Sequence, residues 1–106
     1  MIKINFKVII IDEAKEDIDN ILMNSGNISS NYTEKILDEY EKLISILERN
    51  PYIFPKYKQN YFYKNLFRRA RFLNYYIFYL IKNKEVIIVK ILSCKQDYTQ
   101  FNFLNF

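Results

Sequence analysis

Three arginines and one lysine in the second half of the chain are the residues best suited to bind an anion or an acidic protein. Arg68, Arg69 and Arg71 fall within one predicted strand, residues 62–72, and Lys95 follows a later one. Side chains alternate between the two faces of a strand, so Arg69 and Arg71 share a face and Arg68 points to the other. We therefore expect Arg69 and Arg71 to lead a cationic binding site, with ordinary solvent-facing charge as the alternative.

Positive charge is concentrated in the half of the chain that holds these residues. Residues 1–50 carry six Lys/Arg and ten Asp/Glu, a net charge of −4. Residues 51–106 carry ten Lys/Arg and two Asp/Glu, a net charge of +8. This asymmetry indicates a basic surface suited to nucleic acid or to an acidic protein, and a solvated basic face without a partner is the alternative.

The tyrosines, the single cysteine and the absence of histidine limit which binding sites and reactions the chain can support. Tyr75, Tyr76 and Tyr79 could stack on bases, although packing between strands is the expected use. Cys94 is the only cysteine, so no internal disulfide can form, and we expect it to fill apolar space. The chain has no histidine, which removes the usual proton shuttle at neutral pH and any Cys/His zinc cluster. We expect neither a metal nor a cofactor.

The elements that must position these residues begin with strands. Alternating or β-rich runs predict strands over residues 2–10, 62–72, 75–81 and 86–92. The short polar segment 82–85 predicts a hairpin between the last two, in which Asn83 can adopt a positive φ. Residues 51–60 read as a loop stiffened by two prolines, and residues 98–106 as either a further strand or a tail.

Two amphipathic helices are predicted between the first and second strands. The first begins with Asp12 as its N-cap and ends where Gly26 can adopt a left-handed conformation. Candidate N-caps of the second helix are Ser29, Ser30 and Asn31. Asn31 followed by Glu34 resembles a capping box, and Pro51 ends the helix.

This order predicts an α+β fold of two layers, β-α-α-β-β-β with an optional last strand, in one domain over residues 1–106. The helical hairpin packs on one face of an antiparallel sheet. No run of about 18 apolar residues is present, so we expect no membrane partner. The alternating start of the chain is unlike a signal peptide, which leads us to expect a cytoplasmic protein.

The same order, with specific motifs, resembles the RelE/ParE superfamily of bacterial toxins from about Phe6 to Asp97. Residues 12–18, Asp-Glu-Ala-Lys-Glu-Asp-Ile, are similar to the start of the first helix in ParE-like members, and residues 47–51, Leu-Glu-Arg-Asn-Pro, to their helix-ending segment. The central hairpin is matched by Asn74–Tyr79 and Val86–Leu92. Ser93-Cys94-Lys95-Gln96-Asp97 takes the place of a His-Gly-x-Arg-Asp ending.

The resemblance implies the toxin of a type II toxin–antitoxin pair, blocked by a cognate antitoxin with an acidic or amphipathic segment. RelE-like members cut messenger RNA in the ribosome, whereas ParE-like members act against DNA gyrase. This sequence lacks two RelE-like arginines, because Tyr76 and Gln96 stand at their positions. Arg69 and Arg71 match basic positions of that group, and Tyr98 lies near its terminal tyrosine.

Cleavage of RNA through the 2′-hydroxyl needs proton transfer as well as cations for the phosphate. If the chain were a nuclease, the candidates would be Arg69, Arg71, Lys95 and Tyr98. A tyrosine could move protons only with a pKa far below its ordinary value of about 10. We therefore favour a ParE-like toxin that binds a protein such as gyrase; a ribosome-dependent ribonuclease and a degenerate member that only binds antitoxin are the alternatives.

For the ParE-like interpretation, the predicted partner-binding residues are Arg68, Arg69, Arg71, Tyr76 and Lys95. Arg68 resembles the arginine of a ParE-like Leu-Arg motif. Since it points away from the other two arginines, it could instead pair with a helix carboxylate such as Glu39 or Glu41.

Overall fold

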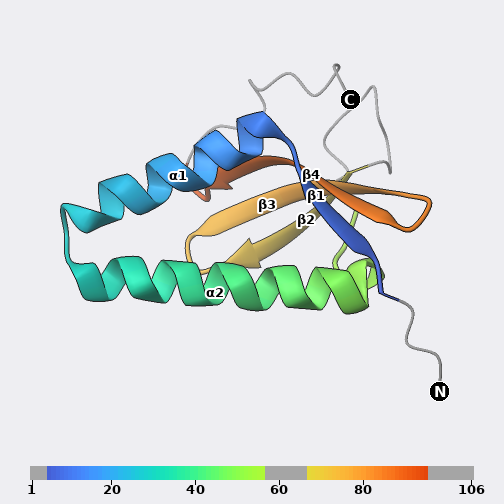
Figure 1. Ribbon diagram of the computed structural model, residues 1–106, viewed down its shortest axis with the longest axis horizontal. Helices are drawn as coiled ribbons and strands as arrows, with labels where there is room; N and C mark the ends of the chain where they lie inside the picture. Colours follow the sequence, from blue (N-terminus) through green and yellow to red (C-terminus); the bar gives the residue numbers. More distant parts are fainter. Residues whose placement is uncertain (1–4, 57–66, 96–106) are drawn as a thin grey trace.

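The computed structural model describes residues 5–56 and 67–95, which form two helices packed on a four-stranded sheet (Figure 1). The elements are β1 (Lys7–Ile10), α1 (Asp12–Gly26), α2 (Ser30–Arg49), the short 3₁₀ helix η1 (Pro51–Ile53), β2 (Phe67–Phe72), β3 (Tyr75–Lys82) and β4 (Glu85–Ser93). The predicted α+β class, with a helical hairpin on one face of the sheet, is confirmed. The predictions for residues 1–4, 57–66 and 96–106, including a last strand or tail, lie outside the described residues.

The sheet has the strand order β1-β4-β3-β2. The pairs β2–β3 and β3–β4 are antiparallel, as predicted, but β1 runs parallel to β4, with Lys7 opposite Glu85. The sheet is therefore mixed. Parallel neighbours need a long connection between them, and here the two helices and the antiparallel strands supply it.

Both hairpin turns place their first residue at a positive φ. Asn83 has φ 58°, as predicted from its tolerance of this conformation. Leu73, in the turn between β2 and β3, has φ 49°, which the sequence did not indicate. Phe72 pairs directly with Tyr75, so only Leu73 and Asn74 are left to reverse the chain, and so tight a turn requires the left-handed conformation.

α1 ends at Gly26, within the predicted segment, but the predicted N-cap Asp12 and the predicted left-handed cap at Gly26 are wrong. Ile11, not Asp12, is the N-cap, and no side chain caps the helix. Ile11 stays extended because its amide donates to the Ile88 carbonyl of β4 at 3.2 Å. At the other end Gly26 is still helical, and Asn27 follows with an ordinary right-handed backbone.

The N-cap of α2 is Ser29, the first of the three candidates, whose side chain accepts a hydrogen bond from the Tyr32 amide at 3.1 Å. The predicted capping box of Asn31 and Glu34 is therefore wrong, since Asn31 already lies inside the helix. The helix ends before Pro51, as predicted, because proline cannot continue it.

β1 begins at Lys7, so Phe6, which the predicted strand 2–10 included, is not part of it. Phe6 lies outside the strand because its amide donates to the Glu48 carbonyl, at the end of α2, at 2.7 Å. β2 begins at Phe67, the first described residue of that part of the chain. β3 and β4 extend one residue beyond the predicted strands at one end or both.

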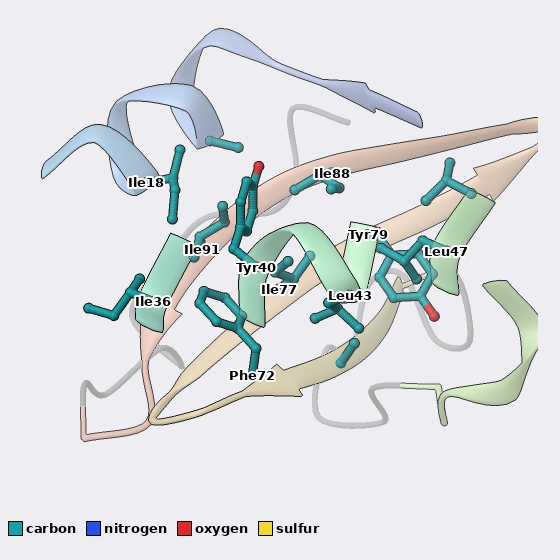
Figure 2. Packing of buried hydrophobic residues seen from close by; sticks show 13 residues of the cluster. Ile18, Ile36, Tyr40, Leu43, Leu47, Phe72, Ile77, Tyr79, Ile88 and Ile91 are labelled. Atoms are coloured by element: carbon teal, nitrogen blue, oxygen red, sulfur yellow. The ribbon is translucent and has the colours of Figure 1, made fainter. Parts of the chain in front are cut away.

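The inner face of the sheet, the face toward the helices, carries the main core. Figure 2 shows side chains of α1 and α2 meeting those of β2, β3 and β4. The buried members are Ala14, Ile18, Ile36, Tyr40, Leu43, Leu47, Ala70, Phe72, Ile77, Tyr79, Val86, Ile88 and Ile91. The helix residues recur every three or four positions, so the predicted amphipathic stripes are the surfaces that bury.

The outer face, opposite the helices, carries a second buried cluster that we had not predicted. It consists of Phe67, Phe78, Val89 and Leu92. A signal was present in the sequence: β3 and β4 read as nearly continuous apolar runs, which are typical of strands buried on both faces. A register shift beside Phe78 and Tyr79 reorients β4 in the middle of this region.

Removing the hydroxyl group from two buried tyrosines of the inner core should have opposite effects on the free energy of unfolding. The Tyr79 hydroxyl donates to the Pro51 carbonyl at 2.7 Å, whereas the Tyr40 hydroxyl is buried with no partner among the described residues. Tyr79→Phe should lower the free energy of unfolding by about 1–3 kcal/mol, because it leaves a buried carbonyl unpaired. Tyr40→Phe, the matched control, should be neutral or stabilising in urea unfolding. Equal effects of the two changes would contradict this assignment.

Candidate functional site: an arginine–tyrosine cluster on the outer face

Arg69 and Arg71 lie together on the outer face of β2, as alternation predicted. The Arg69 guanidinium carbon is 4.3 Å from the centre of the Tyr76 ring, and that of Arg71 is 6.0 Å from it. Tyr76 reaches this position because it stands directly opposite Arg71 in the β2–β3 pairing. We call Arg69, Arg71 and Tyr76 the arginine–tyrosine cluster.

The Tyr76 ring is a supported platform for the two cations. It meets the ring of Phe78 edge to face, with centroids 6.3 Å apart, and Phe78 belongs to the buried outer-face cluster. Arg71 is held further by its Nε–H, which donates to the Leu73 carbonyl at 2.7 Å. A cation over an aromatic face is stabilised by the ring quadrupole, so two like charges can be kept side by side.

Lys95 lies at the end of the sheet where the turn joins β2 to β3, the end that also holds Arg71 and Tyr76. The Cys94 amide donates to the Asn74 carbonyl at 2.8 Å, which brings the end of β4 against the β2–β3 turn. Lys95 is exposed, and its backbone amide donates to the Ser93 hydroxyl at 3.2 Å. Cys94 itself is a half-buried free thiol.

Arg68 is not part of the cluster, because it points to the inner face. Its guanidinium donates to the Phe54 carbonyl at 2.7 Å and to the Tyr52 carbonyl at 3.3 Å, and it lies 5.2 Å from the centre of the Tyr52 ring. The predicted pairing with a helix carboxylate such as Glu39 or Glu41 is wrong. The backbone between Pro51 and Pro55 approaches β2 closely enough to take the guanidinium instead; Arg69 N donates to the Pro55 carbonyl at 3.1 Å.

The other tyrosines of β3 serve packing. Tyr79 is fully buried, and burial raises the pKa of its hydroxyl far above the ordinary value. Tyr75 is half-buried; burial and then the neighbouring Tyr32 hydroxyl raise its pKa. Tyr75 stacks on Phe72 with ring centroids 5.5 Å apart. Of the three, Tyr76 alone belongs to the arginine–tyrosine cluster.

A second charged group, formed by Lys90, Glu13 and Asp17, was missed at the level of sequence. Lys90 Nζ donates to Glu13 Oε1 and to Asp17 Oδ1, both at 3.1 Å. Burial opposes the Lys90 charge, but the two carboxylates outweigh it, and the pKa of Lys90 is raised. The available signal was Lys90 itself, the only charge in the apolar run Val86–Leu92, because such a charge needs a partner.

Tyr98 and Gln96 lie outside the described residues. Across residues 5–56 and 67–95, no three His, Cys, Asp or Glu side chains converge as metal ligands would. Neither described helix has the length and apolar character needed to cross a bilayer.

A sequence-family comparison settles the relationship of the chain. Residues 8–98 match the model of the ParE toxin of the type II toxin–antitoxin system parDE. The chain belongs to the ParE toxin family. A search of curated proteins finds no significant match.

Solved structures agree with the ParE fold. A chain of the chromosomal ParDE toxin–antitoxin system from P. aeruginosa has a TM-score of 0.67 at 13% identity, over 83% of this chain and 95% of that one. Two Helicobacter pylori proteins, a copper-bound mutant toxin and a conserved hypothetical protein, have TM-scores of 0.54 and 0.52 at 21% and 19% identity, each over 83% of this chain and 93% of theirs. At these identities the likeness concerns the fold alone.

The position of Arg69 over Tyr76 can be tested by changing the ring. Tyr76→Phe keeps an aromatic face, whereas Tyr76→Leu removes it at similar apolar character. We expect the Arg69 side-chain NMR signals to keep their ring-current shift in Tyr76→Phe and to lose it in Tyr76→Leu, with a stability loss of about 0.5–1 kcal/mol. Unchanged Arg69 shifts in Tyr76→Leu would show that the stacking is absent in solution.

Proposed function

We propose that this ParE-family chain inhibits growth by binding a protein target such as DNA gyrase, and that a cognate antitoxin neutralises it. The observation that carries the proposal is the arginine–tyrosine cluster, in which two guanidinium groups flank one tyrosine ring on the outer face. The family implies an antitoxin partner. The target and the mode of neutralisation are what we propose here.

The composition and setting of the cluster suit protein recognition. Arginine and tyrosine are, with tryptophan, enriched among the residues that contribute most of the binding energy at protein interfaces. Arg71 is exposed, Arg69 and Tyr76 are half-buried, and Lys95 adds exposed charge at the same end of the sheet. The net charge of +8 on residues 51–106 would also accelerate association with an acidic partner.

The same cluster is poorly equipped for RNA cleavage. It supplies two cations, but within residues 5–56 and 67–95 no carboxylate is recorded in contact with them, and the chain has no histidine to act as a general base. Tyr76 stands where RelE-like nucleases have an arginine. These observations favour inhibition by contact over a ribonuclease; a degenerate member that only binds antitoxin stays an alternative, which the absence of growth inhibition would separate from a toxin.

Antitoxin recognition through the same cations is a further part of the proposal. An acidic or amphipathic antitoxin segment would cover Arg69, Arg71 and Lys95, and would thereby block the surface that meets the target. The predicted contact of Arg68 with a partner stays a prediction; its guanidinium is already engaged with the Tyr52 and Phe54 carbonyls.

Charge reversal at the cluster tests the proposed surface. The double variant Arg69→Glu, Arg71→Glu should abolish growth inhibition and weaken antitoxin binding by at least about a hundredfold, because like charges would then face the partner. Lys35→Glu, Lys42→Glu is the control: it makes the same charge change on exposed positions of α2. Equal loss in both double variants would point to net charge rather than to the cluster.

The nature of the target can be tested by expression from a tightly controlled promoter. We expect a DNA-damage response in cells and inhibition of gyrase supercoiling by the purified protein, with ribosome-bound transcripts left intact. Transcript cleavage that falls about tenfold or more on changing Tyr76 to Ala would instead support the ribonuclease alternative.

A further inference from the structure

An open pocket of about 420 Å³ lies at the end of the molecule where α1 turns into α2 (Figure 1). Its lining comes from α1, from the turn, from Tyr32 of α2, from Tyr75 at the start of β3 and from the last residues of β4. Pockets that bind ligands usually have volumes of about 300–1,000 Å³. None of the three residues of the arginine–tyrosine cluster lines this pocket, so it is a separate candidate site.

The charges that line the pocket cancel. Asp17 and Lys90 are the two charged residues of its described lining, and they form an ion pair at 3.1 Å. Their side chains are only 16% and 12% exposed, and Asp17 Oδ2 also accepts from the Ile91 amide at 3.0 Å. A charged ligand that displaced one partner would leave the other charge unpaired, so the pocket suits an uncharged ligand.

Two asparagines on the α1 side of the pocket have unused hydrogen-bonding groups. Asn20 and Asn24 both line the pocket, and both are exposed. Neither side-chain amide has a hydrogen-bond partner within residues 5–56 and 67–95. An amide side chain offers N–H donors and a C=O acceptor, the same groups as a peptide bond, so each asparagine can both donate to a polypeptide backbone and accept from it.

The spacing of these asparagines matches an extended chain. Residues four apart on a helix lie on one face, with Cβ atoms about 5–6 Å apart. In an extended chain, residues that face the same way recur at every second position, or about every 6.6 Å. One extended segment laid along α1 would therefore present one peptide group to Asn20 and another to Asn24. A helical segment would not, because its backbone groups are bonded to each other.

The pocket also offers apolar surface to a ligand. Ile28, in the turn between the helices, is 73% exposed and lines the pocket, as does the half-buried Ile21. An aliphatic side chain placed against them would remove apolar surface from water on both partners. Since side chains of an extended segment alternate between two sides, every second residue can face the pocket.

We propose that this pocket binds an extended, uncharged segment of a partner protein that carries aliphatic residues at alternate positions. Asn20 and Asn24 hold the backbone of the segment, and Ile21 and Ile28 contact its aliphatic side chains. The neutral lining separates this segment from the acidic one proposed for the arginine–tyrosine cluster. Because the two sites share no residue, occupation of one leaves the other available.

The test uses a blocked pentapeptide, acetyl-Thr-Leu-Thr-Leu-Thr-amide, which is uncharged and rich in β-branched residues that favour an extended chain. Two matched peptides change one property each. Glutamate in place of both leucines adds charge, and ester oxygens in place of the two leucine N–H groups remove backbone donors. Binding to the full chain is followed by NMR of the side-chain amides of Asn20, Asn24 and Asn27.

The neutral peptide should shift the side-chain amide signals of Asn20 and Asn24 and leave the side-chain signals of Arg69 and Arg71 unchanged. The double variant Asn20→Ala, Asn24→Ala should bind it about tenfold or more weakly, and the unchanged chain should bind the ester peptide equally weakly, because hydrogen bonds are lost in both cases. Asn27→Ala is the control: Asn27 is exposed but does not line the pocket, so binding should be unchanged.

The absence of any asparagine shift with up to about 10 mM neutral peptide would overturn the proposal, as would equally strong binding of the glutamate or the ester peptide. Asparagine signals that shift with protein concentration alone would assign the pocket to a second copy of the chain, and would overturn it too. Circular dichroism checks that the variants fold, which alanine favours at exposed helix positions. The ester peptide tests the unchanged chain if a variant fails to fold.

Discussion

The hydrogen-bonding groups of a buried strand must all find partners, and in β4 this requirement organises the structure. One side of β4 is satisfied by β3 along its length. The other side is shared between β1, which pairs with the first part, and Asp17 of α1, which accepts the amide of Ile91. An unpaired buried amide costs about 1–3 kcal/mol, so the bond to Asp17 holds α1 against β4 in addition to the apolar stripe of the helix.

The two faces of the sheet make different contacts. The inner face packs against α1 and α2 to form the main core. On the same face Arg68 holds the chain around η1 by hydrogen bonds to the Tyr52 and Phe54 carbonyls. The outer face combines a small buried cluster with the cations of Arg69 and Arg71. Tyr76 packs on Phe78 and so joins the two, and the arginine–tyrosine cluster therefore stands on paired strands instead of on a loop.

The periodicity of the sequence was enough to predict the helices and strands of this fold, but not the exact ends of the helices or the contacts that fix them. Helical stripes, β-rich runs and the polar turn at Asn83 identified the described elements, and alternation placed Arg69 and Arg71 together. The start of α1 depended on a bond from Ile11 to a distant strand, and the N-cap of α2 depended on which of three adjacent residues was extended. Arg68 and Asp17 were misjudged or missed for the same reason. Their partners are backbone groups, which leave no mark in the side-chain pattern.

The two-residue turn at Leu73 and Asn74 has a consequence for how this surface can fail. It fixes the pairing of β2 with β3 that places Arg71 opposite Tyr76, and its Leu73 carbonyl accepts a hydrogen bond from Arg71 Nε. Sliding β2 by a single position would carry both guanidinium groups through to the side occupied by the helices. A one-residue insertion or deletion in this turn would therefore remove both guanidinium groups from the outer face at once. A substitution elsewhere on this face would remove at most one charge at a time.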